Sequence, residues 1–260
     1  MTSLRLFVRL SGAILATAVC AAVPGAVRLL TFGAMRPASR VGAWSCWVWG
    51  RCMRVILGIR VRVEGTPPHG LFLLASNHLS YLDIMILGSL APSLFVAKRE
   101  IRSWPMFGWM SRGAGTLFVD RDRPKDVVRV AGEMVERLEA GLSLTLFPEG
   151  KSTRGIEVHP FMPSLLEAAA RTGVPCHAVT LRYDAPDFED LPPAVTVCWY
   201  DRAPFVPHIT RLMRLSGVTA TVHFNGPALR SDDRKELARK LRDRVAAAFQ
   251  PVRQTVGDEA

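Results

Sequence analysis

The chain has 260 residues, of which 49% are hydrophobic and 22% charged, a balance that excludes general disorder and suits one globular domain with a membrane-associated extension. Its net charge of +10 comes from Lys and Arg residues spread along the chain without a nucleic-acid-binding motif. Anionic lipid or an acidic soluble partner is therefore expected, and nucleic acid is not. Five cysteines form an odd set without a C-x-x-C pair, so neither a disulfide framework nor a metal site is predicted.

The first hydrophobic segment lies between Arg9 and Arg28 and contains no charged residue. It is near the lower limit of about 17 to 25 residues for a membrane-spanning helix, and Pro24 weakens it. Basic residues before a short apolar core also fit a cleaved signal peptide. Because basic residues occur on both sides, the choice between spanning and re-entering the membrane stays open.

The second hydrophobic segment, Val41 to Ile59, contains three Trp residues and is interrupted by Arg51 and Arg54. Trp and Arg together favour the headgroup region of a membrane. An aromatic stripe is equally typical of a helix packed on a domain. We expect residues 1–60 to form membrane-associating helices.

From residue 61 onward, short apolar runs alternate with segments of helical periodicity. Strands are predicted for the runs LFLLA, GTLFV, SLTLF, HAVTLRY, VTVCWY and VTATVHF. This alternation predicts an α/β domain over residues 61–250, with a mixed central sheet covered by helices. Residues 251–260 are expected to form a flexible tail.

Two helices of this domain have recognisable boundaries. The first runs from Arg123 to a stop at Gly141, and one side of it carries Val127, Val128, Ala131, Met134, Val135 and Leu138. The second closes the domain, with Ser231 as its predicted N-cap and acidic residues in its first turn.

The stretch ASNHLSYLDI places His78 after a predicted buried strand and Asp83 five residues later. On one continuous helix these residues would be separated by about 140° and could not meet. A helix with Ser80 as N-cap puts Asp83 at its third position and leaves His78 free to fold back onto the carboxylate. A His oriented by a carboxylate is a general base, although capping alone would also explain Asp83.

No protein nucleophile is found for this base. G-x-S-x-G is absent, and Cys176 and His177 are neighbours in a predicted strand, so their side chains point to opposite faces. The base is therefore expected to act on a hydroxyl of the substrate. A phosphate-binding loop around G-K-S is not predicted, because Thr145 stands where the loop needs Gly and Pro148 removes a backbone donor. Glu149, at a second strand end, is expected to share one cleft with His78.

Four motifs in order resemble those of the glycerolipid acyltransferases of the lysophosphatidic acid acyltransferase type. The family's NHxxxxD is matched by Asn77, His78 and Asp83, its second block by GTLFVDR ending at Arg121, its FPEG by residues 147–150, and its V-P segment by GVPCHAV from Gly173. Together these motifs cover roughly residues 70 to 182.

The resemblance implies a glycerol-3-phosphate acyltransferase-like fold and direct transfer of a fatty acyl group from acyl-CoA or acyl carrier protein to a lysolipid hydroxyl. No cofactor and no covalent acyl-enzyme are implied. His78 would be the catalytic base and Asp83 its orienting acid. The residues implied or considered for substrate binding are Asn77, Lys98, Arg121, Glu149, Gly150 and Lys151. A surface lysine explains Lys98 equally well.

One departure from the family concerns the acceptor. Lys151, Ser152 and Thr153 stand where the third motif has T-R-S, and Lys replaces the charge of Arg but not its bidentate geometry. The predicted acceptor is 1-acyl-sn-glycerol-3-phosphate, giving phosphatidic acid, and the alternative is another lysolipid such as lyso-ornithine lipid. Since both donors are cytoplasmic, the active domain is predicted to face the cytoplasm on the inner membrane.

Two hypotheses from other classes remain. A metal-dependent hydrolase could combine His78, Asp83 and Glu149 with a further histidine, but no H-E-x-x-H spacing occurs; the candidate histidines are His159, His177, His208 and His223. A non-catalytic lipid-binding membrane protein would keep the basic surface without needing His78.

Overall fold

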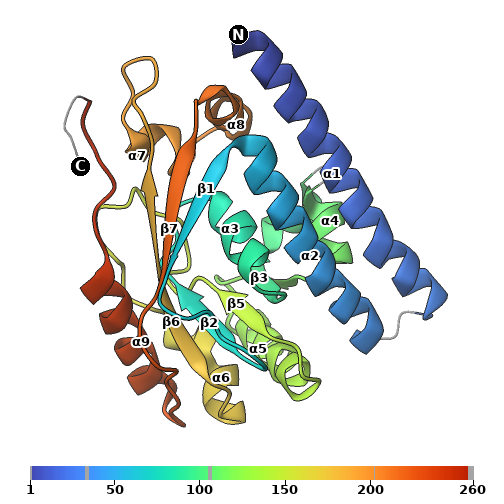
Figure 1. Cartoon of the computed structure of the whole chain (residues 1–260). Coiled ribbons are helices and arrows are strands. Elements are labelled where there is room, and N and C mark those ends of the chain that lie inside the picture. The colour runs from blue at the N-terminus through green and yellow to red at the C-terminus, as the bar shows by residue number, and fades with distance from the viewer. Residues whose placement is uncertain (1, 33–34, 105–106, 202, 257–260) are drawn as a thin grey trace.

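The computed structural model describes residues 2–32, 35–104, 107–201 and 203–256 (Figure 1). Its helices are α1 (Thr2–Leu30), α2 (Met35–Leu57), α3 (Leu82–Leu90), α4 (Phe107–Gly113), α5 (Pro124–Glu139), α6 (Glu167–Thr172), α7 (Pro193–Thr196), α8 (Phe205–Arg214) and α9 (Arg234–Ala248), with the 3₁₀ helices η1 (Arg99–Ser103) and η2 (Pro163–Leu166). Its strands are β1 (Ile59–Glu64), β2 (Leu73–Ser76), β3 (Leu94–Lys98), β4 (Leu117–Val119), β5 (Leu144–Leu146), β6 (Cys176–Asp184) and β7 (Val218–Phe224).

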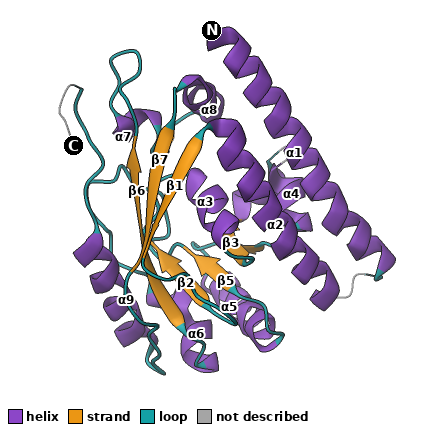
Figure 2. Cartoon of the chain, viewed as in Figure 1, coloured by secondary structure: helices purple, strands orange, loops and turns teal. Residues whose placement is uncertain are grey.

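The strands form one mixed sheet in the order β1-β7-β6-β2-β5-β3-β4, which Figure 2 shows in orange between the helices. The five strands from β6 to β4 are parallel to one another, whereas β7 runs antiparallel to β6 and carries β1 parallel to itself. The predicted fold class, a mixed sheet covered by helices, is confirmed. Because the carboxyl ends of the parallel strands meet at one edge, the residues that follow β2, β3, β4 and β5 gather there.

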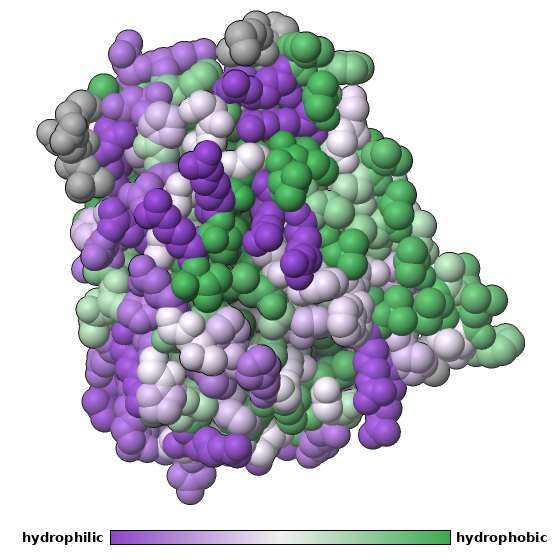
Figure 3. Space-filling model, in the orientation of Figure 1, coloured by the Kyte–Doolittle hydropathy of each residue, from purple (hydrophilic) through white to green (hydrophobic). Residues whose placement is uncertain are grey.

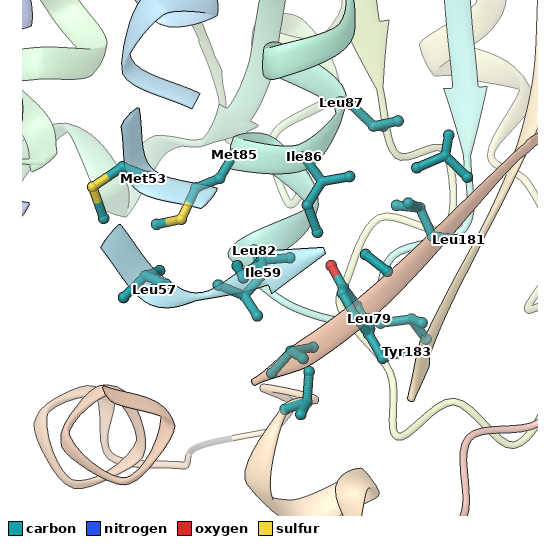
Figure 4. Close-up of a cluster of buried hydrophobic side chains, with 14 of the residues drawn as sticks. Met53, Leu57, Ile59, Leu79, Leu82, Met85, Ile86, Leu87, Leu181 and Tyr183 are labelled. Carbon is teal, nitrogen blue, oxygen red and sulfur yellow. The ribbon is translucent and has the colours of Figure 1, made fainter. Parts of the chain in front are cut away.

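The sheet separates two hydrophobic cores. One core joins α2, α3 and α8 to one face of the sheet, and Figure 4 shows part of it, with Met53, Leu57, Leu82 and Met85. The other core joins α5, α6 and α9 to the opposite face. In Figure 1, α1 and α2 accordingly lie on the side of the molecule away from α9. The two faces of the sheet thus carry different helical layers.

The N-terminal helix α1 lies against α2, α4 and α8. The indole N–H of Trp49 donates a hydrogen bond of 3.0 Å to Thr17 Oγ1, which ties α2 to α1. At the other side, the Arg9 guanidinium donates to the backbone oxygens of Met213 and Leu215 at 3.1 and 2.8 Å. These oxygens end α8, where a cation is favourable because the helix leaves its last carbonyls unpaired.

Several local predictions differ from the structure. The run VTVCWY is not a strand: its start belongs to α7, which begins at Pro193, where a fixed φ and a missing N–H suit the first helical position. Strands β1 and β3 were not predicted. On α5, Val128 is 73% exposed and lies outside the core. The closing helix is capped by Asp233, whose carboxylate accepts from two backbone N–H groups, and not by Ser231.

The expected flexible tail is packed against the domain through its first residues. Val252 is buried, and its N–H donates 2.8 Å to the oxygen of Gly155. Arg253 forms an ion pair of 2.7 Å with Asp187. Residues 257–260 lie outside the described residues.

Candidate functional site

His78 lies in the link between β2 and α3, at the carboxyl edge of the parallel strands. Its Nδ1 is 2.6 Å from Asp83 Oδ2, so the predicted fold-back onto the carboxylate is present. An ionised carboxylate can only accept, which places the proton of the neutral ring on Nδ1 and leaves a lone pair on Nε2. No described residue hydrogen-bonds Nε2, and the side chain is 19% exposed. The ring is therefore oriented to take a proton through Nε2.

The Asp83 carboxylate is fully buried and accepts four hydrogen bonds. Besides His78, the donors to Oδ2 are the backbone N–H groups of Leu79 and Ser80, at 2.7 and 3.1 Å. The fourth donor is the Tyr183 hydroxyl, 2.5 Å from Oδ1. Burial of a carboxylate is tolerated where donors replace water, and four donors also fix the direction from which it meets His78.

The start of α3 differs from the prediction. Its N-cap is Tyr81, which makes no capping hydrogen bond with its side chain, and the predicted cap Ser80 has a buried Oγ without a partner in the described residues. Only the carboxylate half of a capping box is formed, from Asp83 back to the Ser80 N–H. The same carboxylate thus ends the turn and orients His78.

Tyr183 is a site residue that the sequence did not reveal. It lies in β6, is 1% exposed, and in Figure 4 its ring sits among Leu79, Leu82 and Leu181. The alternation of β6 puts Leu181 and Tyr183 on one face, which predicts burial. Contact with Asp83, 100 residues away, depends on which strand neighbours β2.

The His78 ring and backbone are held from several directions. Phe147 stacks on the imidazole, with ring centroids 4.1 Å apart and planes 13° apart. The His78 N–H donates 2.7 Å to Glu149 Oε1, and its carbonyl accepts from the Thr153 N–H at 2.9 Å. These contacts come from the segment after β5, so His78 and Glu149 lie together at the sheet edge, and the shared cleft stays a prediction.

An aromatic cluster supports the turn that follows His78. The Tyr81 ring contacts the rings of Trp199, Phe205 and His208, and Tyr81 Oη is 3.0 Å from His208 Nδ1. The Trp199 N–H donates 2.8 Å to the oxygen of Leu79. Burial lowers the pKa of His208 to about 4, so this ring is neutral at pH 7. The cluster therefore links α8 to the turn by neutral contacts.

Glu149 accepts backbone hydrogen bonds at both oxygens, from His78 at 2.7 Å and from His159 at 2.9 Å. Burial raises the pKa of its carboxyl to about 7, against the lowering effect of these two donors. Glu149 is 7% exposed, and its two hydrogen bonds connect the loop that contains His78 to the loop that contains His159. Direct contact with an acceptor, which the resemblance implied, is limited by this burial.

We expect Glu149 to make the protein less stable as pH rises from about 4.5 to about 7. In that window the folded state keeps the Glu149 carboxyl protonated while the unfolded chain releases its proton. The contribution of Glu149 to the free energy of unfolding therefore decreases as pH rises and is lost once pH passes the folded pKa. At about 1.36 kcal/mol per pKa unit, this group contributes at most about 3 kcal/mol. Thermal unfolding of wild type and Glu149→Gln at stepped pH checks it; a pH-independent difference between them would contradict the prediction.

Gly150 and Arg121 lie side by side at this edge. Gly150 has φ +79°, and a Cβ there would be 2.7 Å from Met162 Sδ and 3.6 Å from Arg121 Nη1. Only glycine adopts this positive φ and fits this close to Met162 without strain. Burial lowers the pKa of Arg121, and its Nε is buried without a hydrogen-bond partner in the described part of the chain. Arg121 and Gly150, both implied by the resemblance to bind the acceptor, therefore lie close together, and their role in acceptor binding stays a prediction.

The remaining predicted binding residues lie in three different environments. Asn77 is 1% exposed and uses both ends of its amide on the Leu181 backbone, at 2.9 and 2.7 Å, so it positions β2 against β6 and does not face a substrate. Lys98 is exposed, is paired with Glu100 at 3.3 Å, and lies level with Val119, at the end of the strand before Arg121. Lys151 is exposed.

No three His, Cys, Asp or Glu side chains in the described ranges are placed to hold a metal ion together. His208 belongs to the aromatic cluster, His177 lies in β6, and His223 on β7 is 3.6 Å from Glu64. The metal-dependent hydrolase hypothesis therefore has no ligand set in the part of the chain that is described.

Known proteins resemble the chain in both sequence and fold. Residues 58–182 match the family model described as Acyltransferase. A lyso-ornithine lipid O-acyltransferase of Rhodobacter capsulatus is 35% identical over 70% of this chain and 67% of its own length. A 1-acyl-sn-glycerol-3-phosphate acyltransferase of Neisseria meningitidis serogroup B is 31% identical over 76% of this chain and 78% of its own.

A solved structure has the same fold. The 1-acyl-sn-glycerophosphate (LPA) acyltransferase PlsC from Thermotoga maritima superposes with a TM-score of 0.65 at 21% identity, covering 95% of each chain. The fold, the ordered motifs and the two relatives agree. The chain therefore belongs to the acyltransferase family that includes the 1-acyl-sn-glycerol-3-phosphate acyltransferases.

Proposed function

We propose that this acyltransferase moves a fatty acyl group from a thioester, acyl-CoA or acyl carrier protein, to the free hydroxyl of a lysolipid at a membrane. The 2.6 Å contact between His78 Nδ1 and Asp83, with Nε2 not hydrogen-bonded to any described residue, carries this proposal. It is the arrangement a general base needs, because the carboxylate fixes the tautomer and stabilises the imidazolium that forms.

In the proposed step the acyl group passes directly from the thioester to the lipid hydroxyl, so that an ester is formed. Nε2 of His78 takes the hydroxyl proton while the lipid oxygen attacks the thioester carbonyl carbon. The C–O bond forms, the C–S bond breaks, and the imidazolium returns its proton to the leaving thiolate. Asp83 keeps its charge throughout and orients the ring. The chemistry needs no cofactor.

Two acceptors remain candidates. Arg121, beside the Gly150 turn, is a cation that a phosphate monoester or a carboxylate could pair with. The sequence ranked 1-acyl-sn-glycerol-3-phosphate first. The relative at 35% identity is named for lyso-ornithine lipid, and Lys151 departs from the family's arginine. Both observations support lyso-ornithine lipid as an acceptor beside 1-acyl-sn-glycerol-3-phosphate.

The proposed membrane contact is the outer side of α1 and α2. By length and composition, α1 is the one helix among the described residues that could cross a membrane. Figure 3 shows green side chains gathered along the right-hand side, where α1 runs, and the strongly exposed apolar residues there include Leu4, Phe7, Leu15, Val19 and Leu29. We assign this face to the inner membrane, with the active domain in the cytoplasm, where both donors are found. Protease protection of tagged termini in inverted vesicles tests the orientation.

A panel assay tests the function. Purified protein in detergent, given labelled acyl-CoA or acyl carrier protein and a set of lysolipids, should form the O-acylated product of at least one of the two acceptors. Turnover that EDTA abolishes would favour the metal-dependent alternative. Lipid binding without turnover for every donor and acceptor would contradict the proposal in favour of a non-catalytic lipid-binding protein.

A further inference from the structure

A pocket of about 390 Å³ lies between α5, η2 and α6, on the face of the sheet opposite α1 and α2. We call it the α5–α6 pocket. Arg121 lies in its lining, and Arg121 Nη1 is close to Gly150, the residue after the glutamate that binds the His78 N–H. The pocket is within the size range of small-molecule sites, about 300 to 1,000 Å³, and it lies near the proposed base.

The charge of the α5–α6 pocket is positive. Arg121, Arg171 and Arg234 line it together with one acid, Glu167. Glu167 is paired with Arg234 at 2.8 Å, whereas Arg171 makes no hydrogen bond or ion pair with the described residues. Two of the three guanidinium groups are thus left without a carboxylate, an arrangement that suits a ligand with more than one anionic group.

The wall between these cations is apolar. Val128, Ala131 and Met162 line it, and Val128 is the residue of α5 that the hydrophobic pattern assigned to the core. At 73% exposure Val128 contributes little to the core, and its side chain instead supplies apolar surface to the pocket wall. An apolar wall between separated cations fits an aromatic base that carries phosphates.

The proposed acceptor site and the α5–α6 pocket meet at Arg121, which lies beside the Gly150 turn and also lines the pocket, and they extend from it in different directions. The lysolipid should enter from the apolar face of α1 and α2, because its chain stays with the membrane. The α5–α6 pocket lies beyond the sheet from that face. We infer that it binds the adenosine 3′,5′-bisphosphate part of the CoA donor, with the 3′-phosphate at the unpaired Arg171 and the pantetheine arm leading past the Gly150 turn to His78. This inference rests on the proposed function, since CoA is the donor only if the protein is such an acyltransferase.

Calorimetric titration of CoA into the full-length protein tests the site without turnover. A charge-assisted hydrogen bond to phosphate is worth about 1.5 to 3 kcal/mol, so Arg171→Ala should raise the Kd for CoA about tenfold or more. Val128→Glu, a change at an exposed position, should weaken CoA at least as much by placing a negative charge on the wall. Arg239→Ala, on the exposed side of α9 and outside the pocket, is the matched control and should leave the Kd unchanged.

Dephospho-CoA makes the test specific to the 3′-phosphate. Wild type should bind dephospho-CoA more weakly than CoA. Arg171→Ala should not weaken the binding of dephospho-CoA further, because this ligand lacks the 3′-phosphate with which Arg171 is proposed to pair. An equal effect of Arg171→Ala on both ligands, no effect on CoA, or binding of acyl carrier protein but not of CoA would overturn the inference. An Arg171→Ala effect on the acceptor KM with the CoA Kd unchanged would also overturn it.

The two proposals can fail separately. If wild type acylates a lysolipid but Arg171→Ala and Val128→Glu bind CoA as wild type does, the function stands and the pocket assignment falls. If CoA binding depends on Arg171 but no lysolipid is acylated with any donor, the pocket stands and the acyltransfer proposal falls. Thermal unfolding of each variant confirms that the exposed substitutions leave the fold intact.

Discussion

Replacing His78 by alanine should lower kcat by about 10²- to 10⁴-fold, the usual contribution of a positioned general base. The lost group is the Nε2 lone pair, and its orientation depends on Nδ1 meeting Asp83 at 2.6 Å. The KM for the acceptor should change little, because the imidazole acts on the proton in the transition state. Steady-state turnover of labelled acyl-CoA with the lysolipid acceptor measures both kcat and the acceptor KM.

A histidine outside the site provides the control for this variant. His223 is half-exposed on β7, and His223→Ala should keep wild-type kcat. The unfolding temperature of His223→Ala should match that of wild type, whereas that of His78→Ala should fall by a few degrees, because the variant loses a donor to the buried Asp83 and the stack on Phe147. Turnover by His78→Ala at more than about a tenth of the wild-type rate would remove the general-base assignment.

Replacing Asp83 by alanine should impair both stability and catalysis. The change leaves the Tyr183 hydroxyl and the N–H groups of Leu79 and Ser80 buried without an acceptor, each at a cost of about 1 to 3 kcal/mol. We expect the free energy of unfolding to fall by about 3 to 5 kcal/mol, which for a chain of this size is a drop of roughly 10 °C in Tm. Differential scanning calorimetry in detergent measures it.

Two milder variants separate catalysis from stability at this carboxylate. Asp83→Asn keeps the shape but offers N–H where Nδ1–H must donate, so kcat should fall as far as in His78→Ala with a smaller loss of stability. Tyr183→Phe removes one donor and should lower kcat only a few-fold. A stable, fully active Asp83→Asn protein would contradict the orienting role.

The sequence predicted the contact between His78 and Asp83 and much of the fold. Spacing alone required a helix start between His78 and Asp83, and the structure has it, although one residue later than Ser80. Strands β6 and β7 were predicted because their apolar residues alternate over many positions. Strand β1 alternates in the same way, but it was missed because its first residues were joined to the hydrophobic segment that ends at Ile59 and was predicted to be helical.

Other features depend on tertiary pairing and could not be read from local patterns. Tyr183 reaches Asp83 only because β6 neighbours β2, and Asn77 meets Leu181 for the same reason. Val128 has the same spacing as the core residues of α5, yet its side chain is largely exposed, because no element among the described residues packs over it. Such contacts require the strand order and the helix layers, which a single sequence does not contain.

The attachment of α1 to α8 has a geometric consequence for substrate choice. Arg9 holds the end of α8, and α8 carries Phe205 and His208, which support the turn after His78. A bilayer that receives α1 would therefore hold the imidazole at one height relative to its surface. Lipids whose hydroxyl lies at that depth would meet the base without leaving their leaflet, and those with a deeper or shallower hydroxyl would have to shift along the membrane normal first.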